Sequence, residues 1–462
     1  MKEHTLIEES GAGYYGLEYL LVTLGCFRNE VESDLLRSEL SSLGFAETTA
    51  VESADIIFVM TCGFVREACD EGIDTMLELD EIGSGQTGKP PMLAIGCMGQ
   101  RYGADLFVEM PELAAVLGCD WQQDIEAAVA DALKGVRHAC RARVPAMFTG
   151  SRSVDSSDNA TLYVRVADGC DRACGFCTIP SIRGPFVSRS PGEVIEEIER
   201  LSSGREREVI LLAQDLTSYG RGLAPGQSLD LAGLVERITG VPGVHWLRML
   251  YLQPEGVTAR LIEQVAGNDR VCNYFDIPFQ HASESVLRRM GRPGGADDYL
   301  DLISRIRRDI PDAAIRSTVM VGYPGETEED FSLLMDFVNE ARFDWLGAFV
   351  FSPEEGTAAA ELGSSVPAEV SLSRYNMVVE TQDEIEASGL DRFPGRELEV
   401  VVDEICEIEP YDMVGRSYRE APVVDGMIYL KRAAAGGRTA EPGDFVRARI
   451  TGHEGLDLVG EI

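Results

Sequence analysis

The sequence predicts an α/β protein made of an N-terminal doubly wound parallel sheet, a central partial (β/α)6 barrel and a C-terminal small antiparallel β-barrel. Two patterns lead to this prediction. Over residues 1–391, short apolar runs alternate with helix-like segments, as in parallel sheets built from βαβ units. From Pro394 the runs shorten and are broken by glycine and proline, which is typical of a small all-β barrel. The length of 462 residues allows two to four domains, each with its own core.

The first predicted domain covers residues 1–148. Its apolar runs predict three buried strands, at residues 19–24, 55–60 and 92–95. A helix is expected at residues 65–78, after the second strand. Asn29 is expected to cap the helix after the first strand, because Glu32 follows at the third helical position and completes a capping box. This alternation predicts a parallel, doubly wound sheet.

Residues 149–160 are polar and rich in glycine and serine, which predicts a linker. The second domain, residues 161–391, contains six predicted strands, at residues 162–166, 209–213, 246–252, 274–277, 315–321 and 347–351. Ser190, with a proline after it and Glu193 at the capping-box position, predicts a helix start, and Thr327 predicts another. Ligands of such folds bind at the C-terminal ends of the strands.

The third domain is expected at residues 392–462. It contains four short β-rich runs, at residues 397–403, 415–418, 427–430 and 445–451. Runs this short, broken by glycine and proline, predict a small all-β barrel of about 70 residues.

The net charge of −37 is spread along the whole chain. Acidic residues outnumber basic residues by 25 to 10 in residues 1–150, by 39 to 23 in residues 151–392 and by 14 to 8 in residues 393–462. Binding to nucleic-acid phosphates needs clustered Lys and Arg, so this distribution argues against a large nucleic-acid surface and favours a basic partner. Solubility or adaptation to salt is the alternative explanation.

The N-terminal sequence predicts no export signal. Residues 1–25 lack the basic segment and the cleavage site of a signal peptide. No apolar run approaches the roughly 20 residues that span a bilayer. We therefore expect a cytoplasmic protein with no membrane partner, in which cysteines stay reduced and serve as metal ligands, catalysts or core residues.

Cys170, Cys174 and Cys177 form a CxxxCxxC pattern. Three thiolates at this spacing can bind three irons of a 4Fe-4S cluster and leave the fourth iron open for a small ligand. A zinc site and chance core cysteines are the alternatives. Zinc ribbons favour two CxxC pairs, and the sequence has no second pair.

A second set of cysteines comprises Cys26, Cys62 and Cys97, each directly after a predicted strand and next to a glycine. If the strands are parallel, the three thiols lie at one carboxyl edge, where such sheets bind ligands. Three buried core cysteines are the alternative reading. The other five cysteines lack this placement and are expected to be core or incidental residues, namely Cys69, Cys119, Cys140, Cys272 and Cys406.

The two cysteine sets together resemble the methylthiotransferases of the radical S-adenosylmethionine (SAM) superfamily. The motifs that carry the resemblance lie at residues 24–26, 61–63, 95–97 and 170–177, and the final domain is similar to a TRAM domain. The resemblance implies two 4Fe-4S clusters, with SAM bound to the open iron of the cluster at Cys170, Cys174 and Cys177. It further implies that SAM is cleaved to a 5′-deoxyadenosyl radical, that the second cluster supplies sulfur and that a second SAM supplies the methyl group.

The segment Ile179-Pro-Ser-Ile-Arg-Gly184 is similar to the branch of the family that modifies an aspartate of small-subunit ribosomal protein twelve. The branch that modifies tRNA adenosine typically reads Val-Pro-Tyr-Thr-Arg-Gly there. Motifs at residues 276–283, 321–327, 351–357 and 415–422 fit as well. The resemblance thus implies methylthiolation of the aspartate β-carbon, with that ribosomal protein and an electron donor such as flavodoxin or ferredoxin as partners.

Two alternative functions remain at this point. One is methylthiolation of tRNA. The acidic C-terminal domain would repel tRNA, so we do not expect direct tRNA binding. The other is a non-catalytic iron–sulfur carrier or ribosome-binding factor, against which the open-iron spacing of the cysteines argues.

Six residues are candidates for the SAM pocket, by resemblance or by their place after a strand: Phe176, Gln214, Asp215, Gly322, Gly325 and Glu326. Loop packing is the alternative for Phe176, and a tight strand–helix turn explains Gly322, Gly325 and Glu326 as well. Arg183 and Arg189 could orient a carboxylate of SAM or of the target aspartate. His281, with Gln280 before it, follows a predicted strand. A lone histidine in such a place is more often structural than catalytic.

Overall fold

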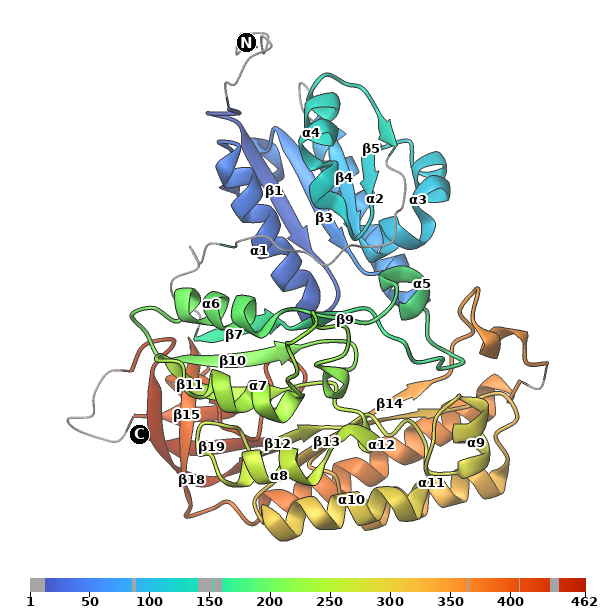
Figure 1. Cartoon of the computed structure of the whole chain (residues 1–462), viewed down its shortest axis with the longest axis vertical. Helices are drawn as coiled ribbons and strands as arrows, with labels where there is room; N and C mark the ends of the chain where they lie inside the picture. Colours follow the sequence, from blue (N-terminus) through green and yellow to red (C-terminus); the bar gives the residue numbers. More distant parts are fainter. Residues whose placement is uncertain are drawn as a thin grey trace. The chain divides into compact units, whose positions relative to one another are not determined.

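The structure, a computed structural model, describes residues 13–84, 89–139, 152, 160–363, 365–406, 408–432 and 440–462 (Figure 1). The chain forms two compact units. Unit 1 comprises residues 1–154 and 178–184, and unit 2 comprises residues 155–177 and 185–462. Most of the predicted linker at 149–160 lies outside the described residues.

Unit 1 is built on a sheet of six parallel strands in the order β2-β1-β3-β4-β5-β6. The strands are β1 (Glu18–Thr23), β2 (Ala46–Thr48), β3 (Ile56–Thr61), β4 (Met92–Gly96), β5 (Leu113–Leu117) and β6 (His138–Ala139). The helices are α1 (Phe27–Ser42), α2 (Arg66–Ser84), α3 (Cys97–Glu109), α4 (Ile125–Leu133) and the short α5 (Ile179–Arg183). The three predicted strands are confirmed to within one residue at either end.

The core of unit 1 explains why these segments fold as they do. Ile57 and Val59 of β3 pack with Met76 of α2 and Met98 of α3. Every residue of β3 and β4 is buried, as expected for parallel strands covered by helices on both faces. The helix predicted at 65–78 is α2, which continues for six residues beyond the predicted end, to Ser84.

The predicted cap at Asn29 is wrong. Helix α1 begins at Phe27, with Cys26 at the N-cap position, because Gly25 turns the chain sharply out of β1 with φ of +96°. The Asn29 side chain instead donates hydrogen bonds to the carbonyl oxygens of Leu24 and Thr61, the latter at 3.2 Å. It therefore ties together the carboxyl ends of β1 and β3.

Unit 2 contains six parallel strands in two sheets of three, with the orders β11-β10-β7 and β12-β13-β14. They are β7 (Thr161–Arg165), β10 (Arg207–Leu212), β11 (Val244–Met249), β12 (Tyr274–Asp276), β13 (Ala314–Val321) and β14 (Trp345–Val350). The Leu252 amide donates to the carbonyl of Asp276 at 2.9 Å and joins the two sheets. The result is the predicted partial (β/α)6 barrel.

The helices of unit 2 are α6 (Pro191–Leu201), α7 (Leu231–Ile238), α8 (Ala259–Ala266), α9 (Glu284–Arg289), α10 (Ala296–Asp309), α11 (Glu328–Ala341) and α12 (Ala368–Leu390). Ser190 caps α6 by accepting a hydrogen bond from the Glu193 amide, and Thr327 forms a full capping box with Asp330 at α11, so both predicted helix starts are confirmed. No helix among the described residues is long and apolar enough to cross a membrane.

The C-terminal part is a closed five-stranded barrel in the order β15-β16-β17-β19-β18. Its strands are β15 (Glu397–Ile405), β16 (Met413–Arg416), β17 (Ile428–Lys431), β18 (Phe445–Glu454) and β19 (Asp457–Glu461). Four pairings are antiparallel, and β17 and β19 pair in parallel. Strand β19 was not among the predicted runs. Val400, Ile428 and Ile450 belong to the apolar core.

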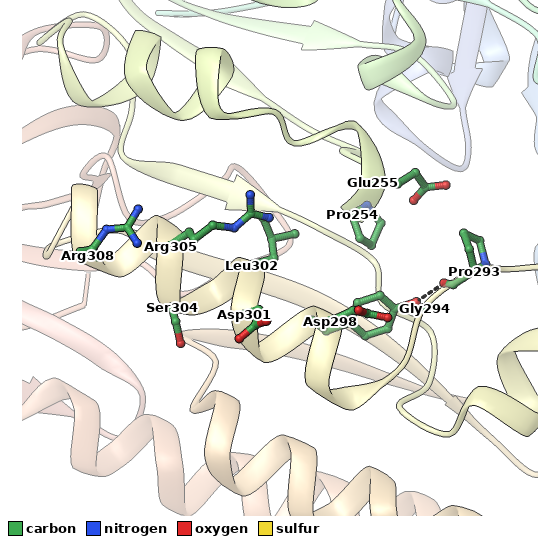
Figure 2. Close-up of a pocket in the computed structure, with 11 residues that line it drawn as sticks. Pro254, Glu255, Pro293, Gly294, Asp298, Asp301, Leu302, Ser304, Arg305 and Arg308 are labelled. Atoms are coloured by element: carbon green, nitrogen blue, oxygen red, sulfur yellow. Dashed lines mark hydrogen bonds between the residues drawn. The ribbon is translucent and has the colours of Figure 1, made fainter.

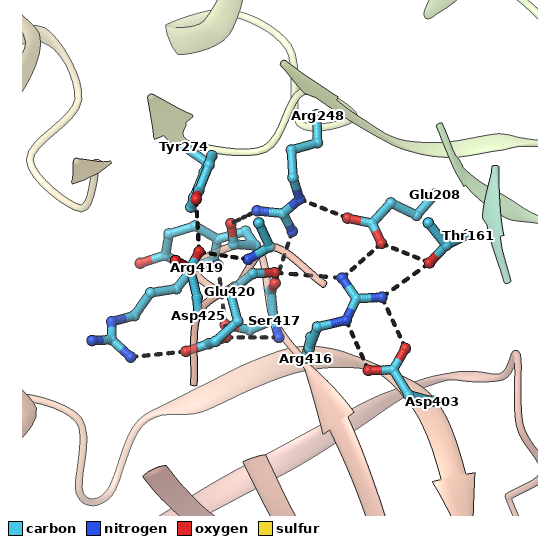
Figure 3. Close-up of polar contacts among 12 residues, drawn as sticks. Thr161, Glu208, Arg248, Tyr274, Asp403, Arg416, Ser417, Arg419, Glu420 and Asp425 are labelled. Atoms are coloured by element: carbon cyan, nitrogen blue, oxygen red, sulfur yellow. Dashed lines mark hydrogen bonds and ion pairs between the residues drawn. The ribbon is translucent and has the colours of Figure 1, made fainter. Parts of the chain in front are cut away.

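A polar network joins this small barrel to the six-stranded barrel within unit 2 (Figure 3). Glu208, near the start of β10, accepts hydrogen bonds from Arg248 at 2.7 Å and from Arg416 at 2.8 Å. Arg248 also donates to the carbonyl oxygens of Ser417 and Tyr418. The loop after β16 therefore covers the end of the barrel where strands such as β10 and β12 begin. The cysteine loop lies at the opposite end, where these strands end.

Candidate functional site

Cys26, Cys62 and Cys97 lie at the carboxyl edge of the sheet in unit 1, where the sequence placed them. Cys26 follows β1, Cys62 follows β3 and Cys97 follows β4, and these three strands are neighbours in the sheet. A Cβ atom on Gly25 would lie 2.7 Å from the Cys62 Cβ, and one on Gly63 would lie 2.7 Å from the backbone of Cys97. Glycine is required at both positions because the three cysteine segments touch.

The three thiols differ in their electrostatic surroundings. Burial, together with smaller contributions from Cys26 and Cys97, raises the pKa of Cys62 to about 12. A hydrogen bond from the Cys119 thiol lowers the pKa of Cys97, and the Arg183 guanidinium, 3.1 Å from the Cys97 Sγ, acts in the same direction. Three thiolates at one sheet edge repel one another, and a bound cationic group would relieve that repulsion.

This donor set fits an iron–sulfur cluster better than a single ion. Within the described ranges, no three His, Cys, Asp or Glu side chains converge on one metal-ion position. A cubane cluster spreads its protein ligands over separate irons, so three thiolates at one sheet edge suit it without such convergence. The residues of unit 1 therefore fit the group that the family resemblance implies.

The CxxxCxxC cysteines lie in one loop of unit 2, directly after the short strand β8 (Ala167–Asp168). The loop turns back on itself through a hydrogen bond of 3.1 Å from the Cys177 amide to the Cys174 carbonyl. Gly175 anchors it, with its amide bonded to the Met290 carbonyl and its own carbonyl accepting from Ala359. The loop is thus fixed at the C-terminal end of the barrel strands, and its three thiols also fit a cluster with one open iron.

Gln214, after β10, offers an unused hydrogen-bond acceptor. Its Nε2 lies 3.5 Å from an oxygen of Asp168, while its Oε1 is buried and has no hydrogen-bond partner. Buried acceptors without partners cost about 1–3 kcal/mol. A ligand that donates to Gln214 would remove this cost, so the geometry is compatible with the predicted SAM contact.

Asp215 is already engaged within the protein. Its carboxylate pairs with Arg172 at 2.7 Å and accepts hydrogen bonds from Thr217 and Ser218. Burial opposes its ionisation, but these hydrogen bonds and the Arg172 charge hold the pKa of Asp215 below its ordinary value. Its main observable role is to fix Arg172 in the cysteine loop, and a SAM contact stays a prediction.

Glu326 holds the turn after β13. One carboxylate oxygen accepts from the amides of Gly322 and Tyr323, and the other lies 3.2 Å from Arg374. Gly322 and Gly325 adopt left-handed φ angles of 77° and 79°, as a tight strand–helix turn requires. SAM contacts at these three residues, and at Phe176, which is half-buried beside Cys177, remain predictions.

Arg189 and Arg183, which the sequence offers as carboxylate-orienting residues, already have partners within the protein. Arg189 donates to the Arg165 carbonyl at 2.7 Å and to Glu197 at 2.6 Å, which gives it a structural role. Arg183 belongs to unit 1 and contacts Cys97 there.

His281 is fully buried, and its Nδ1 accepts from the Ser283 amide at 2.9 Å. The backbone of Gln280, before it, pairs with Thr318 and Met320 of β13. The His281 Nε2 is buried without a hydrogen-bond partner, so a role of His281 in the site stays a prediction.

The prediction that Cys119 does not follow a strand is wrong. Cys119 follows Gly118 directly after β5, as the other strand-end cysteines follow their strands. Its thiol also hydrogen-bonds to Cys97. The signal was present: the apolar run Leu113–Leu117 precedes a Gly-Cys pair, as at Gly96-Cys97. Cys69 and Cys272 are buried, as expected, Cys406 is half-buried, and Cys140 lies outside the described residues.

A groove of about 630 Å³ lies in unit 2 between the turn Pro254–Gly256 and helix α10 (Figure 2). Acidic and basic side chains share its lining, among them Asp298, Asp301, Arg305 and Arg308. None of the six predicted cysteine ligands and none of the six SAM-pocket candidates lines it. The groove nevertheless adjoins the cysteine loop, because Glu255 in its lining pairs with Arg172 of that loop.

Comparison with known proteins identifies all three parts of the chain. Residues 164–338 match the radical SAM superfamily, residues 18–118 match the uncharacterized protein family UPF0004, and residues 395–462 match the TRAM domain. The solved radical S-adenosylmethionine methyltransferase TsrM from Kitasatospora setae has a similar fold, with a TM-score of 0.52 at 15% identity over 72% of this chain and 74% of TsrM. The fold and the CxxxCxxC site define a radical SAM enzyme, whose family implies SAM and a 4Fe-4S cluster.

The curated relatives narrow this class. The ribosomal protein uS12 methylthiotransferase RimO of Pelotomaculum thermopropionicum is 38% identical over 456 residues, which cover 96% of this chain and 99% of the relative. RimO of Geobacter sulfurreducens is 38% identical over 445 residues, which cover 96% and 98%. The chain belongs to the RimO family of ribosomal protein uS12 methylthiotransferases.

Proposed function

We propose that this protein adds a methylthio group to the β-carbon of an aspartate in ribosomal protein uS12. Its membership of the RimO family supports the reaction and the substrate. A structural observation supports the proposal in addition to family membership. Cys26, Cys62 and Cys97 lie together at one sheet edge, and the CxxxCxxC loop supplies a second set of three cysteines. Two cysteine sets match the two tasks of radical formation and sulfur insertion.

The cofactors are two 4Fe-4S clusters and SAM. When bound, they supply the 5′-deoxyadenosyl radical, the sulfur and the methyl group of the reaction. Cys170, Cys174 and Cys177 would hold the first cluster, and Cys26, Cys62 and Cys97 the second. Gln214 would accept a hydrogen bond from SAM through its buried Oε1, and Arg172, fixed by Asp215, would hold the loop in place.

The charge of the protein supports a basic protein substrate. The C-terminal barrel region carries 14 acidic against 8 basic residues, which suits a ribosomal protein and opposes tRNA. Flavodoxin or ferredoxin would supply the electron, and the reaction would take place in the cytoplasm. Methylthiolation of tRNA is the second candidate, and it is tested by offering both substrates to one preparation.

The deciding experiment measures iron and labile sulfide after anaerobic reconstitution of the wild type and of a Cys26/Cys62/Cys97 triple alanine variant. We expect about eight irons in the wild type and about four in the variant, which should still cleave SAM but insert no sulfur. A Cys69→Ala variant is the control for loss of a cysteine in the same unit. About four irons in both the wild type and the triple variant would contradict the second cluster.

Substrate identity is tested separately. Purified uS12 and unmodified tRNA are each incubated with reconstituted enzyme, SAM and a reductant. The masses of the products are then measured by mass spectrometry. A methylthio addition to uS12 alone supports the proposal. Addition to tRNA alone would replace it with the second candidate.

A further inference from the structure

We propose that Arg183 is a positioning residue for the N-terminal cluster, which donates an N–H···S hydrogen bond to Cys97 and raises the reduction potential of that cluster. This inference rests on the proposed function, because that function places a cluster at Cys26, Cys62 and Cys97. It assigns Arg183 a role at the N-terminal cluster, and not the role of orienting a carboxylate of SAM or of the substrate.

The contact itself is direct and buried. The Arg183 Nη2 lies 3.1 Å from the Cys97 Sγ, and its Nη1 lies 3.3 Å from an oxygen of Glu32. All three side chains are buried. Glu32 is in turn bonded to the Trp121 indole at 3.1 Å, so the carboxylate that orients Arg183 is itself held.

Helix α5 brings Arg183 to this position from a distant part of the sequence. Thr178, just before the helix, donates to the Phe64 carbonyl at 3.0 Å, two residues beyond Cys62. Ile182 is fully buried and packs with Cys97 and Cys119. The segment is thus fixed beside two of the three proposed ligands, and helix α5 cannot move away without emptying the apolar site that Ile182 fills.

The chemistry at Cys97 follows from its neighbours. Cys119 and Arg183 both hydrogen-bond to the Cys97 sulfur, and Arg28 adds a second positive charge nearby. Reduction of a cluster adds negative charge, which hydrogen bonds to sulfur and adjacent cations stabilise. Arg183 should therefore make the cluster easier to reduce and should distinguish the iron at Cys97 from the other irons.

A purely structural role for Arg183 makes a different prediction. If Arg183 served only as the partner of Glu32, then Arg183→Gln and Glu32→Gln would break the same ion pair and have the same consequence. If Arg183 acts on the cluster, the two variants should shift the potential in opposite directions. Removing the cation lowers the potential, whereas removing the nearby carboxylate raises it.

The experiment uses the full chain with Cys170, Cys174 and Cys177 changed to alanine, so that only the N-terminal cluster can form. This parent, and its Arg183→Gln, Arg183→Lys and Glu32→Gln derivatives, are reconstituted anaerobically. Iron and sulfide are counted, and the midpoint potential is measured by redox titration followed by electron paramagnetic resonance.

We expect about four irons in the parent, a more negative midpoint in Arg183→Gln, a smaller shift in Arg183→Lys and a more positive midpoint in Glu32→Gln. An Arg183→Gln midpoint equal to that of the parent overturns the inference alone. A parent without iron overturns the proposed function, and the inference with it. If Arg183→Gln does not retain iron, Arg183→Lys decides: a negative shift supports the inference, and an unchanged midpoint rejects it.

Discussion

Glu208 and Arg248 form an ion pair of 2.7 Å between neighbouring strands of the barrel, and neither side chain is exposed to solvent. Arg416 completes the pair from the C-terminal barrel, 2.8 Å from the second Glu208 oxygen (Figure 3). Although burial opposes ionisation, the charges of Arg416 and Arg248 lower the pKa of Glu208, so it remains charged. Buried charges of this kind are tolerated only while every partner is present.

Removing one partner should therefore destabilise unit 2. We expect Arg248→Met to lower the free energy of unfolding by about 3–5 kcal/mol, because it leaves Glu208 charged and buried with one cation fewer. Denaturant unfolding of the protein without cofactors measures the change. The double variant Glu208→Gln/Arg248→Met should lose less than the sum of the two single changes, and strict additivity would contradict the coupling.

Glu386 of α12 should make stability depend on pH. Burial raises the pKa of Glu386 from its ordinary 4.5 to about 8. The folded protein therefore retains a proton that the unfolded chain releases, and this stabilisation is complete below pH 4.5 and lost as pH rises to about 8. Its upper limit is about 5 kcal/mol, at about 1.4 kcal/mol per unit of pKa.

Unfolding measured between pH 5 and 9 tests this dependence. We expect Glu386→Gln, which cannot ionise, to flatten the decline in stability over that range. Glu384→Gln changes an exposed carboxylate on the same helix and should leave the wild-type profile in place. Equal slopes for the wild type and Glu386→Gln would contradict the assignment.

Two glycines one turn apart in α3 should respond oppositely to alanine. A Cβ on Gly99 would lie 2.1 Å from the Leu117 carbonyl oxygen, whereas one on Gly103 would meet no atom within 4 Å. Gly99→Ala should push α3 away from β5, cost about 1–3 kcal/mol and reduce iron bound through Cys97. Gly103→Ala should be neutral or stabilise the helix by up to about 1 kcal/mol. Thermal unfolding and iron content measure both.

Gln214 should contribute to SAM affinity. Replacing it with methionine keeps the approximate volume but removes the buried acceptor, so we expect SAM to bind roughly ten- to a hundredfold more weakly, for a loss of about 1–3 kcal/mol. Anaerobic equilibrium dialysis of the reconstituted protein measures the dissociation constant. Gln227→Met, at an exposed position, is the control, and unchanged SAM binding in Gln214→Met would remove Gln214 from the pocket.

Local sequence patterns predicted most of the fold but little of the contact geometry. Buried strands such as β3 are short continuous apolar runs bounded by turn residues, and this length and these flanks locate them. The cap at Asn29 failed because one flexible residue, Gly25, allowed the helix to begin earlier. The Arg183–Cys97 contact joins residues 86 apart in sequence, and no local pattern encodes it. The cysteine spacing was informative because each thiol follows a strand, whereas Cys119 was missed because β5 itself was not predicted.

Residues 178–184 return to unit 1 from within a stretch of chain that otherwise belongs to unit 2. A protein truncated before residue 160 would lack Ile182 and Arg183, and its remaining sheet would expose the apolar surface around Cys97 and Cys119. Gene fusion or recombination at a single breakpoint could not transfer the N-terminal module intact. The module and the segment after the radical SAM cysteines should therefore have been inherited together, and their sequences should vary in concert among relatives.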